Sequence, residues 1–576
     1  MRSRLAAACI AMALLLGACA SIPTDGPIQY GDGAVDPALP LFPLAAGPRP
    51  GDSPERTVRG FLEAAAAGVT SNFSVAREYL TVQANADWDP TARVVVYDAG
   101  ALTPDYDEAA GVLRYRVPVV AVIDSSGRMS EAAEGDRETV EFWVSQGSDE
   151  QWRISGLDNG VLVQETYLTS WFRPVELVFA SKDSAMVVPE LRWLPNNSIA
   201  SLAARELLEG PSPWLADAVR TGFPPGASLE VDSVVVANTV ASVPLSVESA
   251  GSPAERSLAE EQLRLTLTSL PAVTDVEVTV GGLPIGGVGA VALARAPSPD
   301  ENAAALVADR LGWWNGSQLL VVPDAVGSLP AGARGIARGF DASHVAFLVG
   351  GTRLVTTDVL ATASAELVAL NPEMAPPGQV MDVVEVYSGG LLTEPSYDTY
   401  GWLWTADASR PGWLVAVSPD GEAMMLEARS LEGRAVQSLS VSRDGARIAL
   451  LSTTSGQPTA EVAGVVRDVD GTPLSVSESL PVGAGLAGAV ELAWVDDTRL
   501  AALGTAPDDA NPPPLWVIAV GGRTHTIETV VGVTSISARY GERSITVIAA
   551  DGTVRVRSGT GWSVIASGVS ELAYAG

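Results

Sequence analysis

The chain has 576 residues and carries 68 acidic against 36 basic side chains, a net charge of −32. Such an acidic surface, without any basic stripe, repels phosphate backbones and excludes nucleic acid as a partner. An apolar content of 47% is typical of packed domains, and at about 150 residues per domain the length predicts three or four of them.

The N-terminus has the pattern of a secretory signal peptide. Arg2 and Arg4 precede an apolar run over 5–16, which small residues follow. The run is too short to span a bilayer, because a spanning helix needs about 20 apolar residues. The segment that ends the run resembles the lipobox of bacterial lipoproteins and consists of Leu16, Gly17, Ala18 and Cys19.

The lipobox resemblance implies removal of residues 1–18 and lipidation of Cys19, as an S-diacylglycerol cysteine with an N-palmitoyl group. More than one acyl chain holds a protein stably on a membrane. No later segment is long and apolar enough to span one. The chain has only two cysteines, so loss of Cys9 and lipidation of Cys19 exclude disulfides and thiolate sites.

Residues 19–52 are rich in proline and glycine and predict an extended tether behind the lipidated cysteine. A first domain is predicted over 53–185. Ser53-Pro54-Glu55 is a helix start, and apolar residues then recur at helical spacing. A short second helix over 74–80 follows, and strands are predicted over 93–98, 112–124, 138–145 and 151–157. This α+β order resembles NTF2-like or cystatin-like domains.

A second α+β domain is predicted over 186–290. It begins with a helix over 198–208 and a strand hairpin within 223–246. Ser257 and Glu260 have capping-box spacing, which predicts a helix start at Ser257, and a closing strand follows near 273–285. The segments "LLEGP", "FPPGASLEV" and "EEQLRLTLTSLPAVTDVEVTVGGLP" resemble the GerMN domain.

Residues 300–576 predict an all-β propeller. Asp-Gly pairs at 420–421, 444–445, 470–471 and 551–552 lie between alternating apolar runs, a strong hairpin signal. At roughly 45 residues per four-stranded blade, the block predicts about six blades. Phrases such as "SRDGARIALLS" resemble TolB-type and WD-like blades.

Few residues of the propeller block match a motif for cofactor binding, metal binding or catalysis. "GAGLAG" over 483–488 matches the dinucleotide fingerprint but precedes a predicted strand instead of a helix. The segment that begins at Asp468 resembles the start of a calcium loop, but its glycine is the fourth residue and the EF-hand loop needs glycine at the sixth. A hairpin turn is therefore predicted. His344 and His525 lack metal-ligand spacing and a nucleophile motif, so no metal, cofactor or catalytic residue is predicted.

An aromatic cluster is the candidate binding surface. Trp402 and Trp404 point to one face if their segment is a strand, and Tyr397 and Tyr400 precede them. These side chains either pack between blades or form an exposed surface that anchors a partner.

The order of lipobox, tether, two α+β domains and propeller resembles the LpqB family of actinobacterial lipoproteins. Three phrases carry the resemblance: "LLEGPSPWLADAVRTGFPPG", "EEQLRLTLTSL" and "EPSYDTYGWLWTAD". The family implies a non-enzymatic, lipid-anchored protein at the outer face of the cytoplasmic membrane. It also implies binding to the extracellular domain of an Mtr-type sensor histidine kinase, whose signalling in envelope homeostasis and division it modulates. Only Cys19 is carried over as a site residue.

Two other functions are consistent with the residues. A cell-wall binding module would use exposed aromatic side chains such as Trp404 to hold peptidoglycan or glycan. A propeller hydrolase or lyase would bring acids, or His344 and His525, to one end of the central channel.

Overall fold

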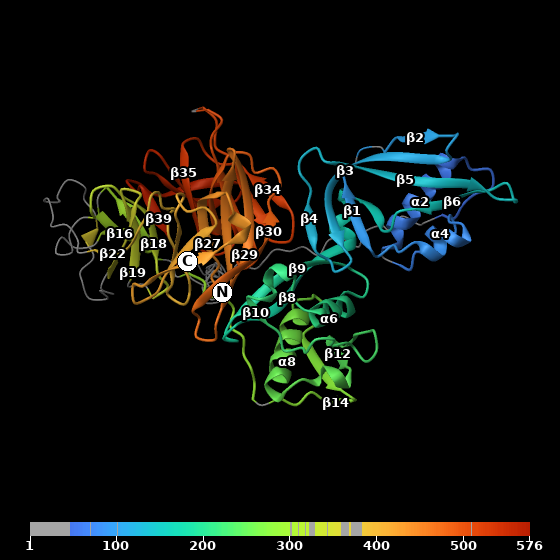
Figure 1. The fold of residues 1–576 in the computed structure, drawn as a ribbon, viewed down its shortest axis with the longest axis horizontal. Coiled ribbons are helices and arrows are strands. Elements are labelled where there is room, and N and C mark those ends of the chain that lie inside the picture. The colour runs from blue at the N-terminus through green and yellow to red at the C-terminus, as the bar shows by residue number, and fades with distance from the viewer. Residues whose placement is uncertain are drawn as a thin grey trace, which may run out of the picture. The chain divides into compact units, whose positions relative to one another are not determined.

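A computed structural model describes residues 46–576 apart from 70, 99, 101, 288, 300–301, 309, 317, 322–328, 342–343, 359–367, 370–382 and 509. Its course is drawn in Figure 1. The lipobox residues Leu16, Gly17, Ala18 and Cys19 lie outside the described residues, so lipidation stays a prediction. Among the described helices, none combines the length and the apolar character needed to cross a membrane.

The first helix forms where its sequence signals predict. Helix α2 spans Pro54–Gly68, and the Ser53 side chain accepts a hydrogen bond from the Arg56 amide at its N-terminus. Val58 and Phe61 lie on its buried face. The predicted second helix over 74–80 is shorter in the structure, where α3 spans Ser74–Arg77. A further helix that was not predicted, α4 (Val82–Asp87), follows it, and the Thr81 side chain caps this helix by accepting a hydrogen bond from the Ala84 amide.

The first domain contains a seven-stranded sheet with the central order β6-β5-β3-β1-β7. All four predicted strands are present, and β7 pairs parallel with β1 beside them. The long strand β3 also pairs with two short strands, β2 and β4. The bounds are β1 Arg93–Tyr97, β2 Pro104–Asp107, β3 Val112–Asp124, β4 Met129–Glu131, β5 Arg137–Gln146, β6 Trp152–Leu157, β7 Val161–Gln164 and the following α5 Glu165–Trp171.

The next sheet has the order β10-β8-β9 and crosses the predicted boundary at residue 185. Strands β8 (Phe172–Ser181) and β9 (Val187–Pro195) pair antiparallel along their length, so that boundary falls in the turn of one hairpin. Helices α6 (Ile199–Glu209) and α7 (Pro213–Ala216) and strand β10 (Val219–Arg220) follow.

A four-stranded sheet with the order β11-β12-β13-β14 completes the second domain. The predicted hairpin is formed by β11 (Val235–Ala237) and β12 (Val240–Leu245), with Asn238 and Thr239 both at positive φ in its two-residue turn. Helix α8 (Pro253–Thr268) connects β12 to the parallel strand β13 (Asp275–Val280), through the 3₁₀ turn η1 (Val247–Ala250), and β14 (Leu283–Pro284) follows.

The predicted start of α8 at Ser257 is wrong by about one turn. Ser252 is the N-cap, Pro253 is the first helical residue and Glu255 completes the capping box. This earlier triplet combines a cap, a proline at the first position and an acid at the third, a stronger start signal than Ser257 provides. Ser257 is buried instead, and its hydroxyl donates to the Gly289 carbonyl at 2.9 Å.

The described strands from Ala303 onward form six sheets, and five of them have four strands in sequential order. The sheets are β18-β19-β20-β22, β23-β24-β25-β26, β27-β28-β29-β30, β31-β32-β33-β34, β35-β36-β37-β38 and the five-stranded β21-β17-β16-β15-β39. The last of these combines β15 (Ala303–Val307) with β39 (Glu571–Ala573), so the C-terminal strand completes the sheet with which the propeller begins.

The strand bounds of the propeller are β16 Arg310–Trp314, β17 Leu319–Val321, β18 Ala333–Arg338, β19 His344–Val349, β20 Arg353–Asp358, β21 Val368–Ala369, β22 Val384–Ser388, β23 Ser396–Tyr397, β24 Leu403–Ala406, β25 Trp413–Val417, β26 Ala423–Glu427, β27 Ala435–Val441, β28 Arg447–Thr454, β29 Gln457–Arg467, β30 Pro473–Val482, β31 Ala489–Trp494, β32 Arg499–Gly504, β33 Leu515–Ala519, β34 Thr524–Ile527, β35 Val533–Ala538, β36 Ile545–Ala549, β37 Val554–Ser558 and β38 Gly561–Ala566. Two short 3₁₀ turns are η2 (Arg429–Leu431) and η3 (Glu542–Ser544).

All four predicted Asp-Gly hairpins are confirmed. They connect β25 to β26, β27 to β28, β29 to β30 and β36 to β37. Each glycine has a φ between 70° and 87°, which a side chain at Cβ disfavours.

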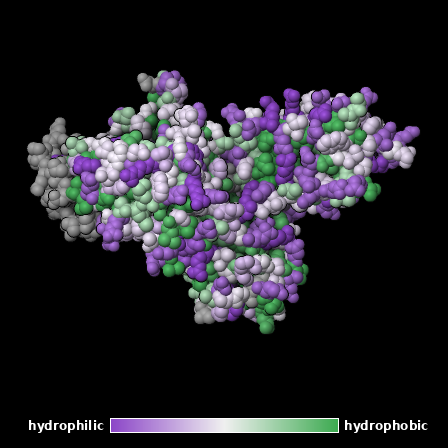
Figure 2. Space-filling model, in the orientation of Figure 1, coloured by the Kyte–Doolittle hydropathy of each residue, from purple (hydrophilic) through white to green (hydrophobic). Residues whose placement is uncertain are grey.

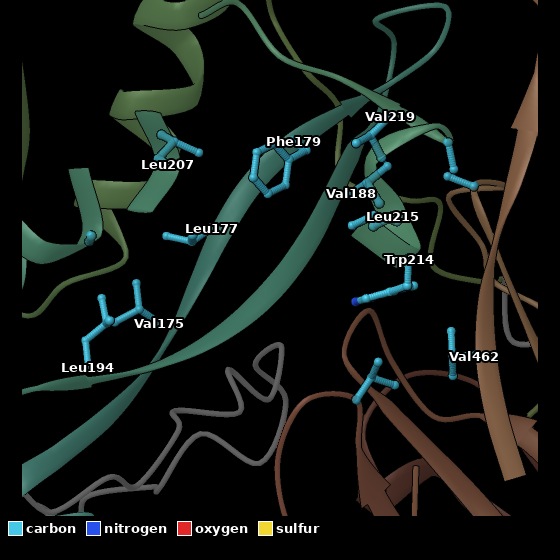
Figure 3. Packing of buried hydrophobic residues seen from close by; sticks show 14 of the residues in the cluster. Val175, Leu177, Phe179, Val188, Leu194, Leu207, Trp214, Leu215, Val219 and Val462 are labelled. Atoms are coloured by element: carbon cyan, nitrogen blue, oxygen red, sulfur yellow. The ribbon is translucent and has the colours of Figure 1, made fainter. Parts of the chain in front are cut away.

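The second domain and the propeller share one hydrophobic core. A single buried cluster joins residues of β8, β9, α6 and α8 to residues of β28, β29 and β31. Figure 3 shows Trp214 of α7 beside Val462 of β29 at this junction. Because apolar side chains of both parts are buried together, the second domain and the propeller pack as one body.

Candidate functional site

The four predicted aromatic side chains do not form one exposed surface. Trp404 is fully buried and Tyr397 is 5% exposed, both within cores between neighbouring sheets. Tyr400 and Trp402 are partly buried. The packing alternative therefore holds for Trp404 and Tyr397, because each contributes an apolar ring to the contact between two sheets.

A buried ion pair fixes this aromatic segment. The Asp398 carboxylate is 0% exposed and pairs with the guanidinium of Arg467. It also accepts a hydrogen bond from Trp404 Nε1 at 2.8 Å. The Arg467 guanidinium in turn lies 4.7 Å from the centre of the Tyr400 ring. A charged pair with further hydrogen bonds gives the segment one rigid geometry.

Tyr400 joins the propeller to the second domain. Its hydroxyl donates to Asp183 Oδ2 at 3.1 Å, in the turn between β8 and β9. Burial and the nearby Asp183 carboxylate raise the pKa of Tyr400 to about 12, so the hydroxyl keeps its proton and the hydrogen bond.

A cavity of about 330 Å³ lies between the sheet β18-β19-β20-β22 and the sheet β23-β24-β25-β26. Tyr397 and Tyr400 line it, together with Asp341 and His344 from the neighbouring sheet. The Asp341 carboxylate contacts His344 Nδ1. Burial, and then the Asp341 charge, raise the pKa of Tyr397.

A second cavity of about 290 Å³ lies among the first strands of the sheets, where Glu394, Glu491 and Glu571 converge. Burial, and then the charge of Glu394, raise the pKa of Glu491 to about 8. The pKa values of the other two glutamates are raised as well, mainly by burial. The carboxyl group of Glu491 therefore holds its proton at pH values where an exposed glutamate is ionised.

Two of these glutamates also join adjacent sheets. Glu491 of β31 accepts a hydrogen bond from the Ile536 amide of β35 at 3.2 Å. Glu571 of β39 accepts one from the Ile336 amide of β18 at 2.9 Å. Serines make the same type of link elsewhere, with Ser438 accepting from the Leu492 amide at 3.1 Å. The side chains at the centre thus satisfy backbone donors of the next sheet.

The junction with the second domain has its own buried charges. Arg447 is 1% exposed, pairs with Asp444 and donates to the carbonyls of Pro189 at 3.2 Å and Asp497 at 2.7 Å. Its guanidinium lies 4.9 Å from the ring centre of Trp494. One side chain therefore connects two propeller sheets and the second domain.

The first domain contacts the propeller through Glu131. Its carboxylate accepts hydrogen bonds from the Thr524 amide at 3.0 Å and the Thr524 hydroxyl at 2.6 Å. Arg523 of the same turn pairs with Glu165. The first domain thus contacts the turn before β34 and the first residue of that strand, and Glu131 also accepts a hydrogen bond from the Ala484 amide at 3.4 Å.

The remaining sequence motifs are parts of turns. The "GAGLAG" segment lies between β30 and β31, so a strand follows it as predicted. Asp468 Oδ1 accepts hydrogen bonds from the Asp470 and Thr472 amides within the β29–β30 turn. His525 belongs to β34, and its Nε2 lies 3.4 Å from Glu542 Oε2. His344 is the first residue of β19.

Within the described residues, no three or more histidine, cysteine, aspartate or glutamate side chains are arranged to hold a metal ion. The two cavities described above, one beside Tyr397 and Tyr400 and one at the converging glutamates, are the candidate sites. Figure 2 shows that hydrophilic and hydrophobic residues are interspersed over the visible face of the molecule.

Comparison with known proteins gives matches along nearly the whole chain. Residues 47–169 match the model of the lipoprotein LpqB N-terminal domain, and residues 305–573 match that of the lipoprotein LpqB beta-propeller domain. The protein named lipoprotein LpqB of Thermobifida fusca is 28% identical over 98% of this chain and 95% of its own length. That of Cutibacterium acnes is 29% identical over 98% of both chains. The chain belongs to the LpqB lipoprotein family.

Between the two LpqB models, residues 176–286 match a model described as sporulation and spore germination. The solved structure of the first GerMN domain of GerM from Bacillus subtilis is similar to this chain at 22% identity. The match covers 21% of this chain and 97% of the GerM domain, with a TM-score of 0.18. The predicted fold class, with a GerMN-like domain followed by a propeller, is confirmed by the family models.

The LpqB relatives are named as lipoproteins and not as enzymes. Membership of a lipoprotein family implies a membrane-anchored, extracytoplasmic protein. The aromatic segment 394–407, which carried part of the sequence resemblance, lines one side of the cavity and contacts the second domain through Tyr400.

Proposed function

We propose that this chain is a non-enzymatic accessory lipoprotein, anchored by lipidated Cys19 at the outer face of the cytoplasmic membrane. In this proposal it binds the extracellular domain of an Mtr-type sensor histidine kinase and modulates its signalling in envelope homeostasis and division. The family membership supports the location, and the kinase is the partner that the sequence resemblance implies.

The observation that carries the proposal is that charged side chains inside the molecule connect separate sheets and domains. Arg447, Arg467 and Glu131 each join separate sheets or domains. Groups held in buried pairs stabilise a single arrangement and are poorly placed to exchange protons with a substrate. A rigid body with an acidic surface suits recognition of a partner protein better than catalysis.

The structure weighs differently on the two other functions. A wall-binding surface built on Trp404 would need its ring exposed, but Trp404 packs in a core between two sheets. A histidine-based enzyme would need His344 and His525 together, but they lie on sheets that are not neighbours in the chain. Acids do converge in the second cavity, as Glu394, Glu491 and Glu571, but Glu491 and Glu571 bond backbone amides of adjacent sheets there.

The test is a titration of soluble chain beginning after Cys19 against the purified extracellular domain of the organism's Mtr-type kinase. We expect saturable binding. Absence of binding at high micromolar concentration, or capture by purified peptidoglycan in its place, would contradict the proposal.

Point variants locate the binding face better than domain deletions, because the second domain and the propeller share a core. Each domain offers a strongly exposed valine that can be replaced: Val82 in the first, Val235 in the second and Val469 in the propeller. Substitution of each by aspartate leaves the interior intact, so the variant that weakens binding identifies the domain, and the other two are its controls.

A further inference from the structure

The cavity between the sheet β18-β19-β20-β22 and the sheet β23-β24-β25-β26 is large enough to hold a small molecule. Its volume of about 330 Å³ lies within the range of ligand pockets, which start near about 300 Å³. Such pockets combine mostly apolar walls with a few polar groups that orient the ligand. Apolar side chains form much of this wall, namely Phe340, Val386, Leu403, Val417 and Pro419.

The packing behind the wall holds the cavity in shape. Leu403 and Tyr397 belong to the buried core between the two sheets. Asp398 fixes the turn that follows Tyr397, because it pairs with Arg467 and accepts hydrogen bonds from two amides of that turn. A pocket that is formed before binding loses little ordering entropy when a ligand enters.

One polar group of the wall, the Tyr397 hydroxyl, has no hydrogen bond to any described residue, whereas the Tyr400 hydroxyl donates to Asp183. Tyr397 is 5% exposed. The Tyr387 hydroxyl also lacks a partner but is sealed in the interior, while the Tyr397 oxygen keeps exposed surface at the cavity that it lines. Burial, and then the Asp341 charge, raise the pKa of Tyr397, so its hydroxyl keeps its proton and can donate it to a hydrogen bond.

The charged groups at the cavity already have partners. Asp398 is paired with Arg467. Asp341 and His344 contact each other at the rim, where 51% and 47% of their side chains are exposed, so solvent screens both groups. Among the described lining residues there is no arginine or lysine. A molecule inside the cavity therefore meets apolar walls, aromatic rings and a hydrogen-bond donor.

We propose that this cavity binds a small uncharged aromatic molecule whose acceptor atom, such as a carbonyl oxygen, takes a hydrogen bond from the Tyr397 hydroxyl. The rings of Phe340, Tyr397 and Tyr400 supply aromatic surface, against which a second aromatic ring packs favourably. The acceptor gives the buried hydroxyl the partner that it lacks, and a buried donor without a partner is costly.

Other classes of ligand suit the cavity less well. An anion would find no arginine or lysine among the described lining residues. A sugar would leave several hydroxyl groups against apolar walls, which costs free energy for each unpaired group. The inference does not depend on the kinase, because it concerns a ligand of the chain alone.

The experiment is an NMR titration of the whole soluble chain with acetophenone, a neutral aromatic ketone. The comparison probes share its carbon skeleton: ethylbenzene lacks the oxygen, and 1-phenylethylammonium carries a charged group in its place. We expect acetophenone to bind saturably at millimolar concentration. The ammonium probe should bind more weakly, because its charge would be buried against apolar walls.

The decisive variant is Tyr397→Phe, which removes only the hydroxyl. We expect it to weaken acetophenone binding about fivefold or more, because the ketone oxygen would be left unpaired, and not to weaken ethylbenzene binding. The matched control is Tyr115→Phe. Tyr115 is 3% exposed in the core of the first domain, and burial raises its pKa to about 12, so this variant also removes a buried hydroxyl but should leave both probes unaffected.

A third variant, Val386→Phe, enlarges a side chain of the wall and should weaken the binding of acetophenone and ethylbenzene alike. Four results would each overturn the proposal. These are no saturable acetophenone binding at millimolar concentration, tighter binding of the ammonium probe, equal effects of Tyr397→Phe and Tyr115→Phe on acetophenone, and unchanged binding of both probes in Val386→Phe.

Discussion

Replacing Arg447 by alanine tests how the propeller is joined to the second domain. The guanidinium is 1% exposed, as is its partner Asp444. Removing one partner of a buried ion pair costs about 3–5 kcal/mol, because the remaining charge has lost its counterion. The stacked ring of Trp494 adds about 1–2 kcal/mol when such a contact is desolvated. The free energy of unfolding should therefore fall by about 4–7 kcal/mol.

The double variant Arg447→Ala with Asp444→Asn separates the charge effect from packing. An asparagine carries no charge, and it can still accept the hydrogen bonds that Asp444 receives from Ser442 and the Ala446 amide. We expect the double variant to be more stable than Arg447→Ala alone. Urea unfolding, followed both by tryptophan fluorescence and by circular dichroism, measures the difference. If the double variant were the less stable of the two, the reasoning from an uncompensated buried charge would be refuted.

Three further outcomes are expected. The pKa of Glu491 is raised to about 8 from 4.5, so its contribution to stability is full below about pH 4.5 and is lost as the pH rises through 8. Thermal unfolding of Glu491→Gln should thus depend less on pH across this window than that of the wild type. Trp404→Ala should cost about 3–5 kcal/mol in urea unfolding, because the ring is fully buried, whereas Trp413→Ala, at a 41% exposed ring, should cost far less. Glu131→Ala removes both hydrogen bonds to Thr524, so limited proteolysis should release the first domain faster, while the unfolding midpoint of the propeller stays unchanged.

Local signals in the sequence predicted the local structure well. Ser53-Pro54 placed the start of α2, and the four Asp-Gly pairs placed four hairpins, because caps and tight turns depend on a few adjacent residues. The start of α8 was misplaced where two cap signals lie close together. Ser257 has the right spacing to Glu260, but Ser252-Pro253 begins the helix and leaves Ser257 buried.

The contacts between the domains could not be predicted from the sequence, because they join residues that are far apart in the chain. Nothing around Arg447 indicates that its guanidinium reaches the Pro189 carbonyl of another domain. Likewise, the run of apolar residues in β8 is compatible with either neighbouring domain, and only its pairing with β9 assigns it to the second. Local periodicity reports burial but does not identify the partner.

The sequence indicates only some of the residues that line the candidate cavity. The sequence marks the aromatic segment around Tyr397 and Tyr400 as either packed between blades or part of an exposed surface, and in the structure both rings line a cavity between two sheets. Asp341 was not singled out at all, and His344 only as an unlikely metal ligand or catalytic group. Both residues reach the cavity from the preceding sheet, so a reading of one segment could not place them there.

The cavity and the domain junction meet at Tyr400. Its ring lies against the Arg467 guanidinium, and its hydroxyl donates to Asp183 of the second domain. Because the second domain and the propeller also share a hydrophobic core, loss of the Tyr400 contact alone would leave the two parts joined. The hydrogen bond therefore positions the β8–β9 turn on the propeller, whereas the shared core supplies most of the free energy that holds the two parts together.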